Sequence, residues 1–239
     1  MSRSPRRDPG PSPRKLSGKG YAGRWNRSRV LDPILVRAVA AGIAIAYVVG
    51  VVFVQGRGRL PIGRRSEFRL EDSPPKALQL LWEAAFLLPN LYPFAAALLP
   101  AWTYGTVLNF SFPLDAVAQL FGLGLWCFGG ALALWSAKVL GRHMIVQIAV
   151  VQDHELITTG PYARVRHPTY LAVMCMVGGL ALFFLSSVLG LFFLLAVALA
   201  NYRARKEERL LSSEQGFGER YRAYGARTGR FFPRLRGSR

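Results

Sequence analysis

The sequence predicts an all-α, polytopic transmembrane protein, a helical bundle with about five membrane helices. The 239-residue chain is 51% hydrophobic and has a mean hydropathy of +0.22, yet its formal net charge is +18. The charges are segregated, because long apolar runs carry almost none and the stretches between them carry many. This pattern is typical of membrane helices joined by basic loops.

A strong basic excess can also indicate a nucleic-acid partner. In this chain we assign it to loops and tails that contact anionic lipid headgroups, and we expect no nucleic-acid partner. Residues 1–30 are rich in Ser, Pro, Gly and Arg and lack apolar periodicity, so we predict a disordered basic tail. No short apolar segment with a cleavage site follows it closely, so we expect no cleaved signal peptide.

Residues 31–140 are predicted to hold the N-terminal membrane helices, in three apolar runs. The first run, 35–54, has about the 20 residues needed to cross the hydrocarbon core. The second run, 77–99, is interrupted by two prolines. The third run, 116–140, contains glycines that allow helices to approach closely: Gly122, Gly124, Gly129 and Gly130.

The last apolar run, residues 171–200, is too long for one straight helix. Ser186, Ser187 and Gly190 near its middle suit a tight turn. We therefore predict two helices of marginal length, tilted or partly shielded by protein. The polar clusters that flank this hairpin would then lie on the same side of the membrane.

The distribution of Lys and Arg predicts the orientation. The 100–113 loop and the hairpin turn lack both residues, whereas the 138–166 connector and the C-terminal tail are rich in them. The positive-inside rule therefore places the connector and the C-terminal tail in the cytoplasm. Five crossings put the basic 1–30 tail outside, one crossing away from the equally basic 55–76 loop. A re-entrant first run, or a second run split at its prolines, would change the count.

Composition and residue spacing also bear on location and metal binding. A composition rich in Ala, Gly and Arg is typical of a GC-rich bacterial genome, so we expect a multi-pass protein of the bacterial inner membrane. Cys127 and Cys175 fall inside apolar runs and are predicted to be packing residues. The three histidines have no Cys or His partner at ligand spacing, so we expect no metal site.

The candidate functional residues lie in the sequence just before and just after the final hairpin. Before it, Gly160 and Pro161 predict a turn, and Pro168 is tolerated in the first turn of the helix that follows. Arg164, Arg166 and His167 crowd this helix N-terminus, where free N–H groups favour anions such as carboxylate or phosphate. After it, Arg203 and Glu207 lie four residues apart and share a helix face, although a snorkelling arginine paired with a glutamate would give the same pattern.

Two motifs in order carry a resemblance to a known family. Residues 154–170 read HELITTGPYARVRHPTY, and after the hairpin come Arg203, the pair Glu207-Glu208, a Gly-x-x-Tyr-x-x-Tyr segment from Gly218 and the late Pro233. This pattern resembles the isoprenylcysteine carboxyl methyltransferase family and its phospholipid methyltransferase relatives. The resemblance covers about residues 144–235, and it implies an integral membrane enzyme that uses S-adenosylmethionine. It makes residues 141–239 a methyltransferase-like catalytic region, with a cytoplasmic cofactor pocket formed by the connector and the C-terminal segment.

The resemblance also implies roles for individual residues. Arg203 and Glu207 would be the catalytic residues, Arg203 facing the lipid substrate and Glu207 also contacting the cofactor. The remaining cofactor-binding residues implied are Gln147, His154, Glu155, Leu156, Ile157, Tyr162, His167, Pro168, Thr169 and Tyr170. Physically, the cofactor offers a carboxylate for cationic and backbone donors, and an ammonium for Glu207. Its sulfonium is a good leaving group, so alignment would supply most of the rate.

Several alternatives stay open at this point. The acceptor is an isoprenoid or prenyl-cysteine carboxylate, or a lipid amine, and Arg203 suits an anionic group. A second function is an NADPH-dependent membrane reductase of the sterol-reductase type, which shares a related Arg-His-Pro-x-Tyr turn. A third is a non-catalytic lipid-binding membrane protein. Among single residues, His167 alone could be a helix cap, and we predict that Glu208 and Arg209 lie on a solvated face.

Overall fold

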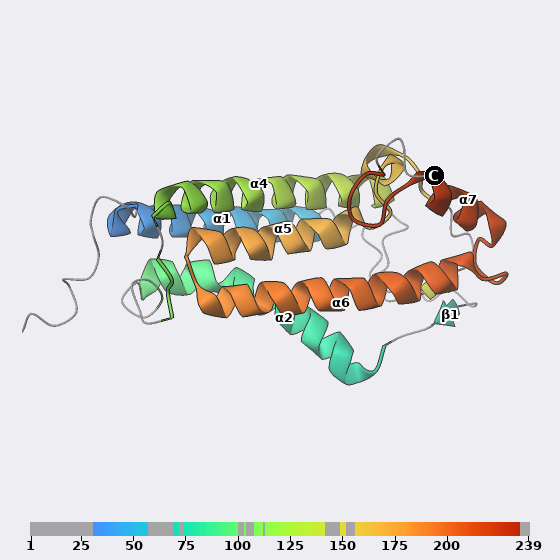
Figure 1. Ribbon diagram of the computed structural model, residues 1–239, viewed down its shortest axis with the longest axis horizontal. Coiled ribbons are helices and arrows are strands. Elements are labelled where there is room, and N and C mark those ends of the chain that lie inside the picture. The colour runs from blue at the N-terminus through green and yellow to red at the C-terminus, as the bar shows by residue number, and fades with distance from the viewer. Residues whose placement is uncertain are drawn as a thin grey trace, which may run out of the picture.

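The computed structural model describes residues 31–56, 69–71, 74–99, 103, 108–111, 113–141, 149–151 and 156–234. The predicted disordered tail, residues 1–30, lies outside these ranges. Within them the chain forms an elongated helical bundle, in which the long helices lie along one axis (Figure 1). The predicted all-α class is therefore confirmed, with one two-stranded ribbon added to it.

The five long helices match the apolar runs of the sequence to within a few residues at most ends. They are α1 (Pro33–Gly56), α2 (Lys76–Leu98), α4 (Asp115–Leu140), α5 (Pro168–Phe183) and α6 (Ser187–Ser212). Two short helices follow the connector and the hairpin, η2 (Gly160–Ala163) and α7 (Glu219–Arg227). Strands β1 (Arg69–Glu71) and β2 (Ala149–Val151) pair antiparallel, with Arg69 opposite Val151.

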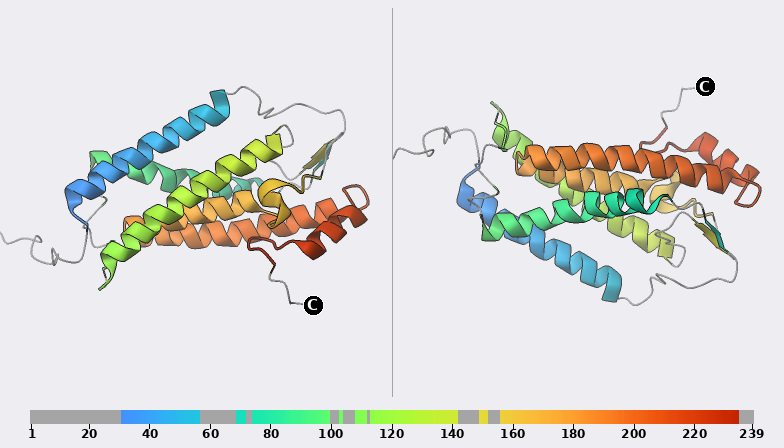
Figure 2. Two further views of the ribbon diagram at one scale, coloured as in Figure 1. Left: turned by 90° about the horizontal axis from the view of Figure 1, so that it is seen from above. Right: turned by 90° about the horizontal axis from the view of Figure 1, so that it is seen from below.

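Successive long helices run back and forth along the bundle (Figures 1 and 2). Helix α1 is continuous over 24 residues, so the re-entrant first run is wrong. Helix α2 continues through Pro89 and Pro93, so the split second run is wrong too. Because β1 follows α1 and pairs with β2 of the connector, both basic connections meet at one end of the bundle. The start of α1 lies at the other end.

The outer surface of the bundle fits a membrane. Three described helices, α1, α4 and α6, are long and apolar enough to cross a bilayer, and the 16-residue α5 is a shorter apolar helix. Large apolar side chains on these helices remain exposed, including Val49 at 60% and Leu191 at 68%. Helix α5 is almost wholly buried between its neighbours, which agrees with the predicted shielding of a short span. The chain is a helical membrane protein.

Two of the four glycines of α4 set how closely it packs on α5. A side-chain carbon added at Gly122 would lie 2.7 Å from the carbonyl oxygen of Gly179, and one at Gly129 would lie 2.8 Å from that of Ala172. These positions are seven residues apart, so they share one helix face. Gly124 and Gly130 face open space instead. The close approach predicted from the glycine content therefore rests on Gly122 and Gly129.

The turn between α5 and α6 lies slightly earlier than predicted. Leu185 adopts a left-handed conformation with φ of 50°, and Ser186 caps α6 by accepting a hydrogen bond from the Leu189 amide. Gly190 lies inside α6, so its placement in the turn is wrong. Helix α6 then continues past the apolar run to Ser212, because the Arg, Lys, Glu and Leu residues there are strong helix formers.

Candidate active site

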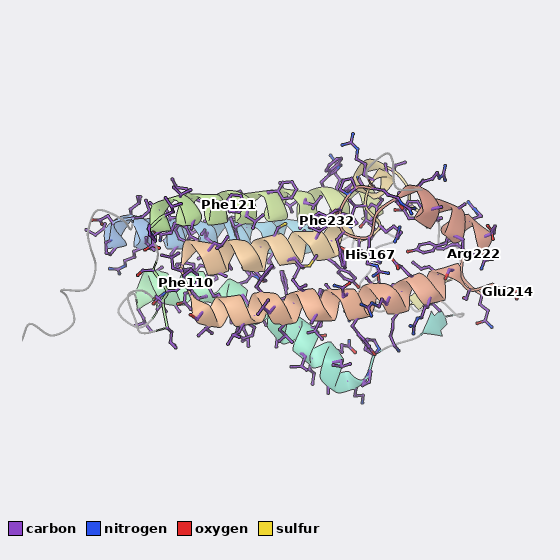
Figure 3. The ribbon with its side chains drawn as sticks, viewed as in Figure 1. Phe110, Phe121, His167, Glu214, Arg222 and Phe232 are labelled. Atoms are coloured by element: carbon purple, nitrogen blue, oxygen red, sulfur yellow. The ribbon has the colours of Figure 1, made fainter. Side chains whose placement is uncertain are left out.

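Three segments far apart in the sequence meet at the end of the bundle that carries the connector. They are the stretch from η2 to the start of α5, the charged half of α6, and the chain around and after α7 (Figure 3). Of the labelled residues, His167 lies near this end, whereas Phe110 and Phe121 lie at the opposite end. The hairpin of α5 and α6 therefore brings the two predicted polar clusters together, as the sequence indicated.

The turn before α5 is formed by special backbone positions. Gly160 has φ of +59°, and a side-chain carbon there would lie 2.8 Å from Val139 of α4. Pro161 follows in the first turn of η2, and Tyr162 is buried at 7% exposure. Pro168 opens α5, as predicted. His167 stands at the N-cap position, but its side chain makes no capping hydrogen bond, so the alternative of a cap is wrong.

Glu207 lies at the centre of the inner contacts. One carboxylate oxygen accepts a short hydrogen bond from the Tyr170 hydroxyl, and the other lies 3.3 Å from Nδ1 of His167. Arg203 donates from Nε to the Tyr170 oxygen at 3.3 Å and is only 5% exposed. The two residues predicted to be catalytic therefore share one tyrosine.

Aromatic rings enclose these polar groups. The His167 and Tyr170 rings stack with centroids 5.4 Å apart and planes 2° from parallel. Trp82 of α2 meets Tyr170 edge-on at 5.1 Å, and the Arg203 guanidinium lies 5.3 Å from the centroid of the Trp82 ring. A guanidinium over an indole face gains cation–π attraction, which is larger where water is excluded. Trp82 is a site residue that the sequence did not reveal.

Glu208 binds three cationic or ionisable groups on other segments of the site. Its carboxylate lies 3.0 Å from Nε of Arg166, 2.6 Å from Nη2 of Arg230 and 3.3 Å from Nε2 of His167. Its side chain is 17% exposed. The predicted solvated face is therefore wrong for Glu208, because the chain after α7 folds back over it. Arg209, one residue on, is exposed as predicted.

We call residues 228–231 the C-terminal strap. The strap pairs with the turn before α5, where the amides of Arg166 and His167 donate to the carbonyls of Gly229 and Arg230 at 2.8 and 3.0 Å. The Arg166 guanidinium donates to the Gly225 carbonyl at 2.9 Å and also to that of Thr228. Arg166 was predicted to favour a bound anion, but in this structure it binds Glu208 and two carbonyls.

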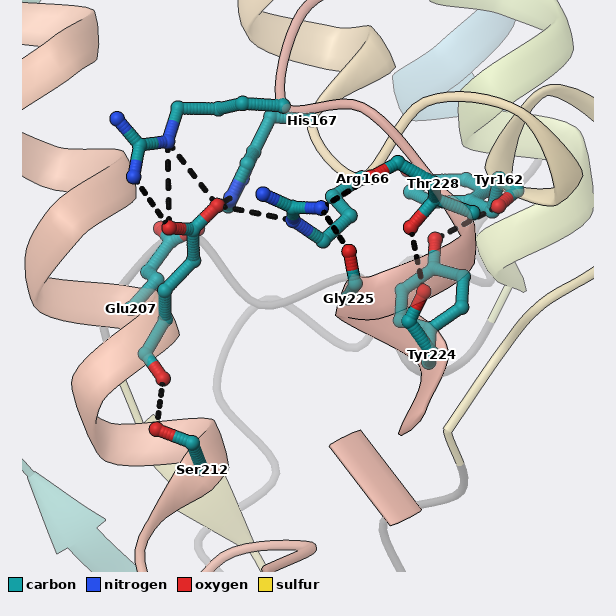
Figure 4. Close-up of polar contacts among 10 residues, drawn as sticks. Tyr162, Arg166, His167, Glu207, Ser212, Tyr224, Gly225 and Thr228 are labelled. Carbon is teal, nitrogen blue, oxygen red and sulfur yellow. Dashed lines mark hydrogen bonds and ion pairs between the residues drawn. The ribbon is translucent and has the colours of Figure 1, made fainter. Parts of the chain in front are cut away.

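A second set of contacts ties α7 to the same turn. The Tyr224 hydroxyl donates to the carbonyl of Tyr162 at 2.6 Å, and the Thr228 hydroxyl donates to the carbonyl of Tyr224 at 2.8 Å (Figure 4). Tyr221 and Tyr224 are both buried. The two tyrosines of the Gly-x-x-Tyr-x-x-Tyr segment therefore close one side of the site.

Burial and charge shift the pKa values of the groups around the turn. Burial lowers the pKa of His167, but its interactions with Glu207 and Glu208 outweigh burial and leave the pKa raised. Burial raises the pKa of Tyr162, and it raises that of Tyr224 to about 12. Both tyrosines are therefore hydrogen-bond donors at neutral pH, and His167 holds its proton more strongly than an exposed histidine.

The predicted site residues fall into two groups. Those that the structure brings together are Tyr162, His167, Thr169, Tyr170, Arg203 and Glu207, with Thr169 interacting with the Tyr162 hydroxyl. Leu156 and Ile157 are half-buried on the approach to η2, and Pro168 is buried at the start of α5. Gln147, His154 and Glu155 lie outside the described residues. The missed residues are Trp82, Glu208 and Arg230, and only the Glu-Glu pair gave a signal in the sequence.

Fold and site together define a class: a helical membrane protein with a polar, aromatic-lined site at one end of its bundle. The family model described as the isoprenylcysteine carboxyl methyltransferase (ICMT) family matches residues 122–213. The chain is 31% identical over 169 residues to the protein-S-isoprenylcysteine O-methyltransferases of Mus musculus and Homo sapiens. Over the matched residues the chain is therefore similar to the isoprenylcysteine carboxyl methyltransferase family.

These matches cover only part of the chain. Each alignment with the mammalian methyltransferases covers 68% of this chain and 58% of the relative, so the chain spans less than two thirds of their length. A further relative, the nickel-cobalt-cadmium resistance protein NccN of Alcaligenes xylosoxydans xylosoxydans, is 43% identical over 108 residues. That alignment covers 44% of this chain and 49% of the relative. No group of three or more His, Cys, Asp or Glu residues among those described could hold a metal ion.

Proposed function

We propose that the protein is an S-adenosylmethionine-dependent methyltransferase that acts on a lipophilic acceptor held in the membrane. The observation that carries the proposal is the meeting of Glu207, Tyr170, His167 and Arg203 in one partly buried site at the end of a membrane bundle. The isoprenylcysteine O-methyltransferases among its relatives support the same chemistry.

The residues present fit such a cofactor. The Glu207 side chain is 23% exposed, so part of its carboxylate remains open to an ammonium or hydroxyl group. The stacked rings of His167 and Tyr170 lie beside that carboxylate and fix its position. Tyr162, Leu156 and Ile157 would complete the pocket from the η2 side, with Gln147, His154 and Glu155 from the connector. When bound, the cofactor supplies an activated methyl group on a sulfonium.

The chain's own residues would then bind and orient the acceptor. Arg203 lies on the inner face of α6, where Trp82 and Tyr170 hold its guanidinium in place. A fixed guanidinium suits a carboxylate, which is ionised at neutral pH and needs no general base before it attacks. We therefore favour a prenyl-cysteine or isoprenoid carboxylate as acceptor, entering from the bilayer between α2 and α6. The site would face the cytoplasm of a bacterial inner membrane, since the basic connections lie at its end.

The test is calorimetric binding of S-adenosylmethionine to detergent-purified protein, with Glu207→Gln as the variant. The matched control is Glu214→Gln, an exposed glutamate seven residues further along the chain. Because one charge-assisted hydrogen bond contributes about 1.5–3 kcal/mol, we expect Glu207→Gln to weaken binding by at least roughly tenfold. The control should leave affinity unchanged.

Binding should then be followed by transfer of a labelled methyl group to a farnesylated cysteine with a free carboxylate. Transfer to that acceptor but not to its amide supports carboxylate methylation, and transfer to a lipid amine instead would correct the acceptor. Saturable binding of NADPH without binding of S-adenosylmethionine would refute the proposal in favour of a reductase. Binding of neither by folded protein would refute it in favour of a lipid-binding role.

A further inference from the structure

The exposed face of α6 changes from apolar to cationic residues along the helix. Leu191 and Leu194 are 68% and 63% exposed, and Ala198, Arg205 and Arg209 continue the same exposed stripe. The spacings of three, four, seven and four residues keep all five on one side of the helix. One helix face therefore runs from lipid-facing apolar residues directly into two exposed arginines.

The depth of these arginines matches a lipid headgroup. Helix α6 begins at Ser187, and 18 residues of helix up to Arg205 span about 27 Å at 1.5 Å per residue. The hydrocarbon core of a bilayer is roughly 30 Å thick. Arg205 therefore emerges at the membrane–water interface, and Arg209 lies one turn beyond it.

A hollow in the surface lies at this place. It has a volume of about 310 Å³ and is lined by Arg205, Glu208, Arg209, Ser212 and Arg230. The Glu208 carboxylate is already bound by Arg166 and Arg230, and the Ser212 hydroxyl donates to the Glu208 carbonyl at 2.6 Å. The guanidinium groups of Arg205 and Arg209 form no hydrogen bond or ion pair with any residue in the described part of the chain. Within the described residues, the hollow therefore carries a positive charge that no neighbouring carboxylate neutralises.

We propose that this hollow binds the phosphate of an anionic membrane phospholipid, whose acyl chains lie along the apolar stripe of α6. Arg205 and Arg209 would bind the phosphate oxygens, and Arg230 would lie beside it. The two arginines that would hold the phosphate point away from Arg203, because Arg203 and Arg205 are about 200° apart around the helix. The hollow adjoins the candidate active site, since Glu208 and Arg230 line it too. Lipid binding in the hollow is independent of the proposed function, since it needs no methyl transfer.

The test is native mass spectrometry of the full chain in a non-ionic detergent, titrated with phosphatidylglycerol and, separately, with phosphatidylcholine. The variant is Arg205→Gln with Arg209→Gln. The matched control is Arg220→Gln with Arg227→Gln, which removes two exposed charges from α7 outside the hollow. Thermal melting of each protein reports whether it is folded.

The wild type should bind one phosphatidylglycerol in preference to phosphatidylcholine. Each arginine near an anionic surface contributes about a factor of five, so the variant should lose on the order of tenfold or more in affinity. The control should stay within about twofold. Equal losses in both variants, or no preference for the anionic lipid in the wild type, would overturn the proposal. Competition by glycerol phosphate at the same concentration as the lipid would overturn it in favour of a soluble anion.

Discussion

Replacing Glu208 with glutamine tests whether the C-terminal strap is held by charge. Glu208 binds Arg166 at 3.0 Å and Arg230 at 2.6 Å, and its side chain is 17% exposed. Hydrogen bonds to charged groups each contribute about 1.5–3 kcal/mol, so the two arginines give roughly 3–6 kcal/mol before screening. The amide keeps one carbonyl acceptor, and partial exposure weakens the pairing, so we expect a loss of about 2 kcal/mol.

That loss should appear locally, as easier opening of the strap. The amides of Arg166 and His167 are bonded to strap carbonyls, so their hydrogen exchange reports the opening. A change of about 2 kcal/mol is roughly a 30-fold increase in the open fraction. We therefore expect exchange at these two amides to accelerate by about 30-fold in Glu208→Gln and to stay unchanged in Glu214→Gln. Exchange that is unchanged in both variants would show that main-chain pairing alone holds the strap.

Three further outcomes follow from the geometry. Gly129→Ala should lower thermal stability in detergent by about 1–3 kcal/mol, because its side chain would meet the α5 backbone, while Gly130→Ala should change it little. The pKa of His167 is raised in the folded protein, so protonated His167 contributes its full stabilisation below about pH 6.5, the usual pKa of histidine. This stabilisation is lost as the pH rises through the higher pKa of the folded state. His167→Gln should flatten that pH dependence in melting curves, and a dependence unchanged in the variant would assign it elsewhere. Tyr170→Phe removes the hydroxyl that binds Glu207, so S-adenosylmethionine affinity should fall by roughly tenfold, and an unchanged affinity would place the cofactor elsewhere.

Much of the fold could be predicted because membrane helices are marked by their length and apolarity alone. The hairpin was predictable for the same reason. Because its two helices are antiparallel, Pro168 and Glu207 were expected at the same end of the bundle. The exact turn was not predictable, because Leu185 rather than a glycine adopts the left-handed conformation. There the turn is set by long-range contacts, such as the Asn109 amide donating to the Phe184 carbonyl.

At the site, too, local features could be predicted and long-range contacts could not. Arg203 and Glu207 could be placed on one face, because a spacing of four residues is a local property of a helix. The burial of Glu208 could not be predicted, since it depends on a strap about 20 residues later that folds back along the helix. Trp82 comes from α2, about 120 residues before Arg203, and nothing local in the sequence links the two.

The adjacent residues Glu207 and Glu208 contact different parts of the site, because neighbouring positions on a helix point about 100° apart. Glu207 faces Tyr170 on α5, and Glu208 faces the strap, but His167 lies between them, with Nδ1 towards one carboxylate and Nε2 towards the other. This arrangement needs α6 to reach past the start of α5. Helix α5 has 16 residues and is about 24 Å long, whereas α6 extends about 33 Å from Ser187 to Glu208. The extra length carries the glutamates beyond the apolar bundle, to where the connector and strap can surround them.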